Sequence, residues 1–338
     1  MIDKYIVITT INDPNEAIIK YRNWKGWKLI VVGDRKTNKF WSASNVIYLD
    51  IEEQKRLYGE LSEHISENTY KRKMLGYIWA IQHGAKAIFE TDDDNFPYKE
   101  AQKAVESVID NKHANEIKKI GNKNGWVNIY REFGINNCWP RGFPIDLISD
   151  KTPNIYLKNN KNDSLGLVQY LVDLDPDVDA IYRMTSINSE IKFKKKDPII
   201  LNVNSFCPIN SQATLWLSDY FPLMFFPLGV SDRVTDILRG YIALACLWKM
   251  NKSVSYHSPI VYQLRNNHNL LNDFKEESFL YLNARILSKI LLGVKGDTPS
   301  KLYLSALNLL VENNYLSQLN TNAYLQFLNN IDVTIFEK

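Results

Sequence analysis

Short apolar runs alternate with amphipathic stretches along the first part of the chain. Lys4–Thr10 and Trp27–Gly33 are rich in β-branched residues, which is typical of buried strands. Between them, Asp13 followed by Pro14 predicts an N-cap with proline at the first helical position, and a helix to about Arg22. This order predicts a parallel, doubly wound sheet whose ligand crevice lies at the carboxyl ends of the strands. The residues at those ends are mostly polar: Thr9, Thr10, Asn12, Asp13, Gly33, Asp34 and Arg35.

Helical and strand periodicity continues further along the chain. Tyr70–His83 has apolar residues at helical spacing and Gly84 as a C-cap, whereas Trp126–Arg131 is interpreted as a strand. Val230–Lys249 predicts a helix with a wide apolar stripe. Glycine inside a helix costs about 1 kcal/mol relative to alanine, so Gly240 predicts the close approach of another backbone.

The pattern as a whole predicts an α/β fold with a mostly parallel sheet flanked by helices. Amphipathic segments near 276–291, 299–312 and 316–329 predict a C-terminal helical appendage. We therefore expect a sheet domain over residues 1–265 and a helical region over 266–338.

Amino-acid composition limits the classes of protein to which this chain could belong. The chain has 338 residues, of which 45% are hydrophobic and 23% charged, which is globular composition. Its 41 basic and 38 acidic residues give a net charge of +3, which does not indicate a nucleic-acid binder. No apolar stretch approaches the roughly 20 residues that span a bilayer, and the N-terminus lacks a signal-peptide layout, so we expect a soluble, cytoplasmic protein. Three cysteines without CxxC spacing fit a reducing compartment and are interpreted as packing residues: Cys138, Cys207 and Cys246.

An acidic turn carries the first candidate chemistry. Three carboxylates follow directly after the apolar run Ala87–Phe89, and because adjacent aspartates repel one another, a bound cation is the economical explanation. Alternate residues of an extended segment point the same way, so Asp92 and Asp94 can face one ion while Asp93 faces elsewhere. An Asp-x-Asp after a central strand suits a hard divalent ion that also holds a diphosphate. The alternative is a capping turn before a helix.

The helix predicted from Tyr70 begins with an unusual charge. Lys71, Arg72 and Lys73 lie in its first turn, where cations oppose the helix dipole. A ligand anion nearby would compensate for them. The alternative is a solvated basic face.

The helix predicted from Val230 carries a second acidic pair. Asp232, Asp236 and Arg239 line the side opposite its apolar stripe. The helix dipole accounts for one aspartate in the first turns, and the other is a candidate catalytic base.

Six blocks in one order carry a family resemblance: ITTINDP (8–14), VVGDRKT (31–37), FETDDDN (89–95), WPRGFP (139–144), DPDVDAIYR (175–183), and TDILRGY followed by LW (235–241, 247–248). With them the chain resembles the STELLO-type family of glycosyltransferases. More distantly it resembles the plant reversibly glycosylated polypeptides, which act as UDP-arabinopyranose mutases. Any one block alone would be a weak signal, whereas six in order are specific.

The resemblance implies a GT-A-like (Rossmann-like) fold with a mixed, mostly parallel sheet, a metal site in the donor half and a base supplied by the acceptor half. Asp92 and Asp94 would hold Mn²⁺ or Mg²⁺, and Asp93 would contact the ribose or the sugar. His257 stands where many GT-A enzymes place a late metal-binding histidine, and the alternative is a histidine hydrogen-bonded near the core.

The resemblance also implies a set of contacts to the nucleotide sugar. Thr9, Asn12 and Asp34 would line the pocket for the base and ribose, with Arg35 near the phosphates. The remaining candidates for these contacts are Arg72 and Arg239.

The loop at 139–144 bears on the choice of chemistry. In the mutases a loop with Arg-Gly-Tyr-Pro contains the arginine that becomes glycosylated, and Arg141 matches it. In the STELLO-like interpretation Arg141 would instead hold phosphate or sugar. The sequence of this chain matches the STELLO-type motifs more closely than the mutase motifs.

The predicted function is metal-dependent transfer of a sugar from a nucleoside-diphosphate sugar, with UDP as the expected nucleotide, to an acceptor hydroxyl. Asp236, or failing that Asp232, would take the acceptor proton if the reaction inverts the anomeric centre, and a retaining enzyme would need no such base. The expected partners are the nucleotide-sugar donor and a glycan or lipid-linked acceptor of bacterial surface-glycan assembly. Peripheral association with the inner face of the membrane and the oligomeric state stay open.

Three alternatives accompany this prediction. A UDP-sugar mutase would work through Arg141, and a non-catalytic GT-A-like assembly partner would use the C-terminal helices as its interface. A metal-dependent nucleotidyltransferase is less favoured, because ITTINDP lacks a glycine-rich phosphate loop.

Overall fold

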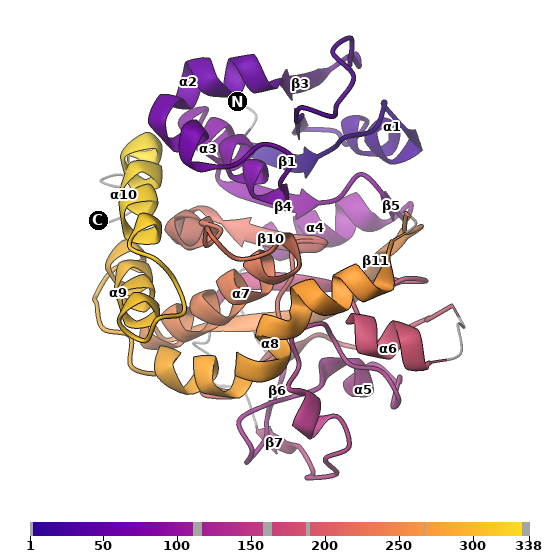
Figure 1. Ribbon diagram of the computed structural model, residues 1–338. Coiled ribbons are helices and arrows are strands. Elements are labelled where there is room, and N and C mark those ends of the chain that lie inside the picture. The colour runs from indigo at the N-terminus through magenta and orange to yellow at the C-terminus, as the bar shows by residue number, and fades with distance from the viewer. Residues whose placement is uncertain (1–2, 111–116, 158–163, 187–189, 267, 333–338) are drawn as a thin grey trace.

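The computed structural model describes residues 3–110, 117–157, 164–186, 190–266 and 268–332 (Figure 1). Its strands are β1 Lys4–Thr9, β2 Trp27–Val32, β3 Val46–Leu49, β4 Ala87–Thr91, β5 Asn95–Pro97, β6 Lys118–Gly121, β7 Ile155–Leu157, β8 Ser164–Asp173, β9 Ile199–Leu201, β10 Ala213–Leu217 and β11 Lys252–Gln263. Its α-helices are α1 Glu16–Arg22, α2 Ile51–His64, α3 Lys73–Gln82, α4 Ala101–Asp110, α5 Ile129–Glu132, α6 Ala180–Thr185, α7 Asp232–Lys249, α8 Leu270–Leu291, α9 Pro299–Glu312 and α10 Leu319–Ile331. Short 3₁₀ helices lie at η1 Tyr70–Arg72, η2 Ile145–Leu147 and η3 Ser218–Met224.

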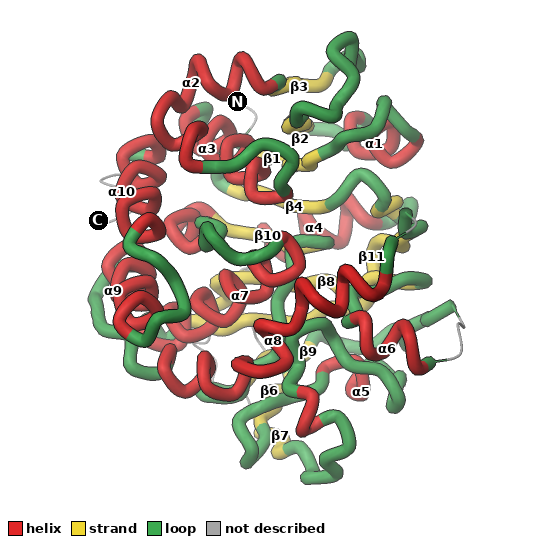
Figure 2. The backbone as a smooth tube through the Cα atoms, viewed as in Figure 1, coloured by secondary structure: helices red, strands yellow, loops and turns green. Residues whose placement is uncertain are grey.

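One mixed sheet organises the described chain in the order β3-β2-β1-β4-β10-β8-β11-β9-β6-β7, with β5 paired to β11. The first four strands are parallel, which confirms the doubly wound start that the sequence predicts. β10 is antiparallel to both β4 and β8, and β8 then runs parallel to β11. Helices cover both faces of the sheet (Figure 2), so the α/β class is also confirmed.

Alternation along β1 divides the interior into two apolar clusters. Tyr5 and Val7 belong to the larger one, which includes residues of α3, α7, α9 and α10. Ile6 and Ile8 point to the other face and belong to the smaller cluster with residues of α1 and α4. Successive strand residues face opposite sides, and here both faces of β1 are covered by apolar side chains. A ligand can therefore reach β1 at its carboxyl end.

Helix α1 begins two residues later than the sequence predicts. The predicted cap was Asp13, but the side chain of Asn15 accepts a hydrogen bond from the backbone N–H of Ile18, and the helix starts at Glu16. The prediction was wrong because asparagine is as good a cap as aspartate and the chain still has to leave the sheet edge. Asp13 instead accepts a hydrogen bond from Asn38.

The predicted strand at Trp126–Arg131 is also wrong. Within the described parts of the chain, Trp126 alone of this segment makes a β-bridge, with Phe206, and Asn128 then caps the short helix α5 through the backbone N–H of Tyr130. A local asparagine cap competes with strand pairing, and here it prevails.

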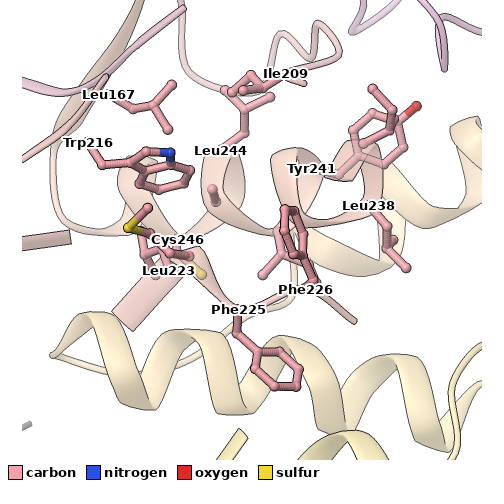
Figure 3. Close-up of a cluster of buried hydrophobic side chains, with 14 of the residues drawn as sticks. Leu167, Ile209, Trp216, Leu223, Phe225, Phe226, Leu238, Tyr241, Leu244 and Cys246 are labelled. Atoms are coloured by element: carbon pink, nitrogen blue, oxygen red, sulfur yellow. The ribbon is translucent and has the colours of Figure 1, made fainter. Parts of the chain in front are cut away.

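Helix α7 runs through the larger cluster, and fifteen of its residues are buried. A Cβ atom on Gly240 would lie 2.4 Å from the carbonyl oxygen of Ile209, which confirms the predicted backbone approach. Around this contact, aromatic and aliphatic side chains from α7, β10 and η3 pack together (Figure 3). The middle of α7 is therefore packed closely against the segment that precedes β10.

The three predicted C-terminal helices are present as α8, α9 and α10. They contribute residues such as Leu280, Leu302 and Phe327 to the same apolar cluster as β1 and α3, and α10 lies beside α2 and α3 (Figure 1). The division at residue 265 stays a prediction. Within the described ranges, no helix is long and apolar enough to cross a membrane.

Candidate active site

A cleft with a volume of about 650 Å³ opens at the carboxyl ends of β1, β2 and β4, where the doubly wound pattern predicts a ligand crevice. It is bounded on its other side by the start of α7 and by the residues that follow β11. The predicted site residues that line it are Thr9, Asn12, Asp34, Arg72, Asp92, Asp93, Asp94, Arg141, Asp232 and Asp236. Arg35, Arg239 and His257 are not among its lining residues.

Asp92 is hydrogen-bonded to η1 and to the first residue of α3. Its Oδ1 accepts hydrogen bonds from the Tyr70 hydroxyl at 2.6 Å and from Nζ of Lys73 at 2.8 Å, and the Lys73 side chain is fully buried. Burial raises the pKa of Asp92, although Lys73 and Tyr70 act in the opposite direction. Oδ2 accepts no hydrogen bond from the described residues, so one oxygen stays available to a ligand.

Asp93 faces the loop after β1. Its Oδ2 accepts hydrogen bonds from the Thr10 hydroxyl and from Nδ2 of Asn12, the latter at 2.9 Å. Asn15 donates to its backbone carbonyl at 2.7 Å. Asp93 thus joins the turn after β4 to the loop where the nucleotide pocket is predicted, and its partners differ from those of Asp92 and Asp94.

Asp94 is the least satisfied carboxylate of the turn. Its Oδ2 accepts a hydrogen bond from Nε2 of Gln263 at 2.9 Å, whereas Oδ1 is buried without a hydrogen-bond partner. Burial, together with repulsion from Asp92 and Asp93, raises its pKa to about 7. A buried acceptor without a donor is costly unless a proton or a cation satisfies it.

These observations fit a divalent cation. Oδ2 of Asp92 and Oδ1 of Asp94 lack protein partners among the described residues, and carboxylate oxygens are the ligands that Mg²⁺ and Mn²⁺ prefer. No group of three or more His, Cys, Asp or Glu side chains within those residues could hold a metal by itself. Such an ion would therefore need oxygens from a ligand, as is usual where one or two carboxylates bind Mg²⁺ beside phosphates.

Asp232 lies at the first position of α7 and is bound to the η1 segment. Its Oδ1 accepts hydrogen bonds from the Thr69 hydroxyl and from Nζ of Lys71, the latter at 2.6 Å. Its Oδ2 accepts one from the backbone N–H of Tyr70 at 2.9 Å. Since the Tyr70 hydroxyl also reaches Asp92, one tyrosine spans both carboxylates. Lys71 is thus an ion-pair partner within the protein and not part of a solvated basic face.

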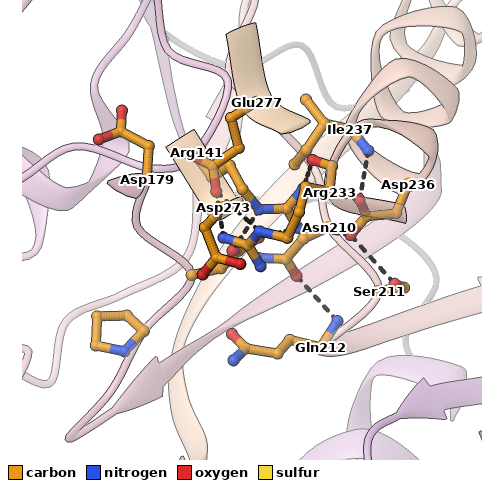
Figure 4. Close-up of polar contacts among 12 residues, drawn as sticks. Arg141, Asp179, Asn210, Ser211, Gln212, Arg233, Asp236, Ile237, Asp273 and Glu277 are labelled. Carbon is orange, nitrogen blue, oxygen red and sulfur yellow. Dashed lines mark hydrogen bonds and ion pairs between the residues drawn. The ribbon is translucent and has the colours of Figure 1, made fainter. Parts of the chain in front are cut away.

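Asp236 and Arg141 form a buried ion pair. Two nitrogens of Arg141 donate to the two oxygens of Asp236 at 3.0 and 2.9 Å, and its other edge donates to Asp177 at 2.7 and 2.8 Å. Arg141 also donates to the backbone carbonyl of Arg233, so all five guanidinium N–H groups are engaged. Figure 4 shows Asp236 with its bonds to Ser211 and Ile237. Although burial acts to raise it, the pKa of Asp236 is lowered because Arg141 favours the carboxylate.

The predicted nucleotide pocket is assembled around Asp34. Its Oδ1 accepts hydrogen bonds from the backbone N–H of Asn68 and of Arg35, and its Oδ2 accepts one from Thr69. The Arg35 side chain points outward instead, into a half-exposed ion pair with Glu67. The phosphate role predicted for Arg35 is not supported, because its guanidinium is turned away from the cleft.

Arg72 lines the cleft, but its guanidinium is bound to the carboxyl end of α2, so its contact to the nucleotide sugar stays a prediction. It is 1% exposed and donates to Gln54, to the Ser62 hydroxyl and to the carbonyl of Ile65. Orphan carbonyls at a helix end need donors, and a guanidinium supplies several.

Arg239 also has a structural role and not the predicted contact to the nucleotide sugar. Its guanidinium donates to both oxygens of Glu90 at 2.9 and 2.7 Å, and both side chains are fully buried. Trp216 donates to the same carboxylate and stacks against the arginine. The sequence could not show that Arg239 is buried against Glu90, because the two residues are 149 positions apart in the chain.

His257 lies in the middle of β11, and the structure does not bring it to the cleft. Its ring packs against Tyr170, its Nε2 lies 3.0 Å from the Ser255 hydroxyl, and burial lowers its pKa to about 4. The metal-ligand prediction is therefore corrected: the end of β11 reaches Asp94 through Gln263, six residues further along.

Several residues that line or support the cleft were not predicted from the sequence. Arg183, Arg233 and Arg265 line its far side, and Tyr70 and Ser211 connect Asp92 to Asp236 through hydrogen bonds. Arg183 lies in one of the six blocks, which was a usable signal. Arg265 follows the last strand without any motif around it.

Comparison with known proteins adds the family. No family model matches the chain. Two proteins of Arabidopsis thaliana, "Probable glycosyltransferase STELLO2" and "Probable glycosyltransferase STELLO1", are each 28% identical to it, over 312 and 315 residues. These alignments cover 87% and 88% of this chain, and the chain spans 40% of the length of each relative. The chain is thus similar to the STELLO-type glycosyltransferases over most of its own length. The resemblance carried by the six blocks is thereby confirmed.

Among solved structures, apo mouse xyloside xylosyltransferase 1 aligns with 38% of this chain and 55% of its own, at 13% identity and a TM-score of 0.20. A superposition this poor carries no argument about chemistry. The STELLO-type similarity and the geometry of the cleft are therefore the basis for function.

Proposed function

We propose that this protein is a metal-dependent glycosyltransferase of GT-A type that transfers a sugar from a nucleoside-diphosphate sugar to an acceptor hydroxyl. The observation that carries the proposal is the buried Oδ1 of Asp94, which has no hydrogen-bond partner, beside Oδ2 of Asp92, which accepts no hydrogen bond from the described residues of the cleft. The similarity to the STELLO-type relatives supports the same reaction class. UDP as the nucleotide and surface-glycan assembly as the pathway belong to the proposal.

The donor would bind across the acidic turn. Asp92 and Asp94 would hold Mn²⁺ or Mg²⁺, which when bound neutralises charge on the departing diphosphate. Asp93, already bonded to Thr10 and Asn12, would orient the ribose or sugar beside that ion. Lys73 keeps Oδ1 of Asp92 occupied, so the carboxylate presents its other oxygen to the ligand.

Counting lone pairs reverses the predicted order of the two candidate bases. A carboxylate can accept about four hydrogen bonds, and Asp236 already accepts four, from Arg141 twice, Ser211 and Ile237. Asp232 accepts three and its side chain is 36% exposed. For an inverting reaction Asp232 is therefore the better proton acceptor, and Asp236 would position Arg141.

The mutase alternative is less favoured. Attack by Arg141 on a sugar would need a neutral guanidinium with a free nitrogen lone pair. Its five N–H groups are all donated, and although burial acts to lower it, the pKa of Arg141 is raised well above its usual value because Asp177 and Asp236 stabilise the cation.

The test is metal-dependent nucleotide binding. In Asp92→Asn and Asp94→Asn, calorimetry should find that UDP affinity in the presence of Mn²⁺ falls by about 100-fold, as expected for the loss of a metal ligand. Asp146→Asn is the matched control, since Asp146 is exposed and paired with Arg285 outside the cleft. Undiminished UDP binding in both turn variants would remove the metal site, and a screen of UDP-sugars by thermal shift would identify the donor.

A further inference from the structure

Three arginines gather on the side of the cleft that the donor prediction leaves unused. Arg183 lies in the last turn of α6, Arg233 is the second residue of α7, and Arg265 comes two residues after β11. In the sheet order, β1 and β2 lie on one side of β4 and its acidic turn, whereas β8 and β11 lie on the other. The arginines therefore stand across the acidic turn from the predicted nucleotide pocket.

Each of these arginines is anchored from behind by one carboxylate. Arg183 pairs with Asp175, Arg265 pairs with Asp273 at 2.8 Å, and Arg233 pairs with Glu277. Figure 4 shows Arg233 close to Asp273 and Glu277. Since Glu277 is fully buried and Asp273 nearly so, the anchors fix the guanidinium groups in place.

The anchors do not use all the donors. Arg265 donates only through one Nη atom, and the described residues offer no partner to its Nε or its other Nη. Nη1 of Arg233 likewise has no acceptor there, and Nε of Arg183 is buried and unpaired. Burial, followed by repulsion from Arg183 and Arg233, lowers the pKa of Arg265 to about 10. Three cations thus share one space with N–H groups to spare.

Arg141 shows what a fully satisfied arginine looks like in the same cleft. It lies between Asp177 and Asp236 and uses all five donors on protein groups. The three others differ from it in having a single carboxylate each. The arrangement therefore calls for one more anion, and the fork of a guanidinium matches phosphate and carboxylate oxygens.

We propose that Arg183, Arg233 and Arg265 form a second anion site, which binds a phosphate or carboxylate group of the acceptor. The assignment to the acceptor rests on the proposed transferase function, while the anion site itself does not. The acceptor class would then be an anionic one, such as a phosphate-linked glycan or an acidic sugar. Neutral glycans would leave the spare donors and the mutual repulsion uncompensated.

Inorganic phosphate is the probe, and its binding is measured by calorimetry and ³¹P NMR on the full chain. Arg265→Gln should weaken phosphate binding by about tenfold or more, the usual effect of losing charge-assisted hydrogen bonds. Arg265→Lys keeps the charge but loses the fork and should weaken it less. Arg56→Gln is the control, since Arg56 is an exposed arginine paired with Glu53 on α2.

Competition separates this site from the donor site. Phosphate should still bind when Mn²⁺ and UDP saturate the protein, and it should still bind to Asp94→Asn. One-for-one displacement of phosphate by UDP would overturn the proposal, because the arginines would then belong to the diphosphate. Equal phosphate affinity in wild type, Arg265→Gln and Arg265→Lys would overturn it as well. If UDP fails to bind while phosphate binding depends on Arg265, the transferase function fails and the anion site stands.

Discussion

The two sides of the cleft differ in which hydrogen-bond partners they lack: one side lacks donors and the other lacks acceptors. Among the described residues, Asp92 and Asp94 at the acidic turn have oxygens without donors, whereas Arg183 and Arg265 on the far side have N–H groups without acceptors. Between them, Arg141 and its two carboxylates are fully matched. Matched charges hold the fold together, and unmatched ones indicate where a ligand completes the site.

The largest effect is expected where a matched pair is broken. Glu90→Gln leaves Arg239 buried with no compensating charge, so the free energy of unfolding should fall by about 3–5 kcal/mol. Urea denaturation measures this. Glu53→Gln, which removes an exposed ion pair, should leave the denaturation midpoint at the wild-type value. Equal midpoints for the two variants would contradict the distinction between matched buried pairs and surface pairs.

The second effect is a pH dependence caused by Asp94. Its pKa is raised from 3.8 to about 7 in the folded protein, so in EDTA the protonated group stabilises the fold at low pH, and this contribution is lost as pH rises through about 7. The loss is at most about 4 kcal/mol, from 1.36 kcal/mol for each unit of pKa. Denaturation at a series of pH values measures it.

Asp94→Asn should flatten that pH profile, and saturating Mn²⁺ should restore the stability of the wild type above pH 7 but not that of the variant. A wild-type profile in EDTA that does not fall between pH 4 and about 7 would show that Asp94 ionises without cost.

The third effect separates the two aspartates of α7. If the reaction inverts, Asp232→Asn should lower kcat by about 100-fold or more with little change in UDP affinity, because a general base acts only on the chemical step. Asp236→Asn should instead lower stability, because Arg141 loses one of its two carboxylates. Steady-state kinetics and denaturation distinguish the two. Wild-type kcat in Asp232→Asn would mean that no base is needed at this position.

The smallest effect is expected for Arg35. Its exposed pair with Glu67 lies outside the cleft, so Arg35→Gln should change UDP affinity by no more than about twofold. Calorimetry with UDP and Mn²⁺ is the measurement. A tenfold loss would mean that the side chain turns inward when the donor binds.

Much of the fold could be predicted from the sequence because its signals are local. The alternation in β1 and β2, the stripe of α7 and the C-terminal amphipathic segments all depend on residues close together in the chain. Two local predictions were wrong because an asparagine cap prevailed. Asp13 lost to Asn15, and Asn128 began a helix where a strand was predicted.

The candidate site was predictable to the extent that it follows from strand ends. Asp92 to Asp94, Asp34 and Asn12 come directly after strands, and the parallel sheet brings those ends to one edge. By itself, then, the sequence determined the class of fold, the acidic turn and the helix that faces it. Only the tertiary structure decided which charged residues are bound by other protein groups, as Arg72 and Arg239 are, and which still lack a hydrogen-bond partner. The reason is that the partner of a buried charge lies tens of residues away, and no local pattern records it.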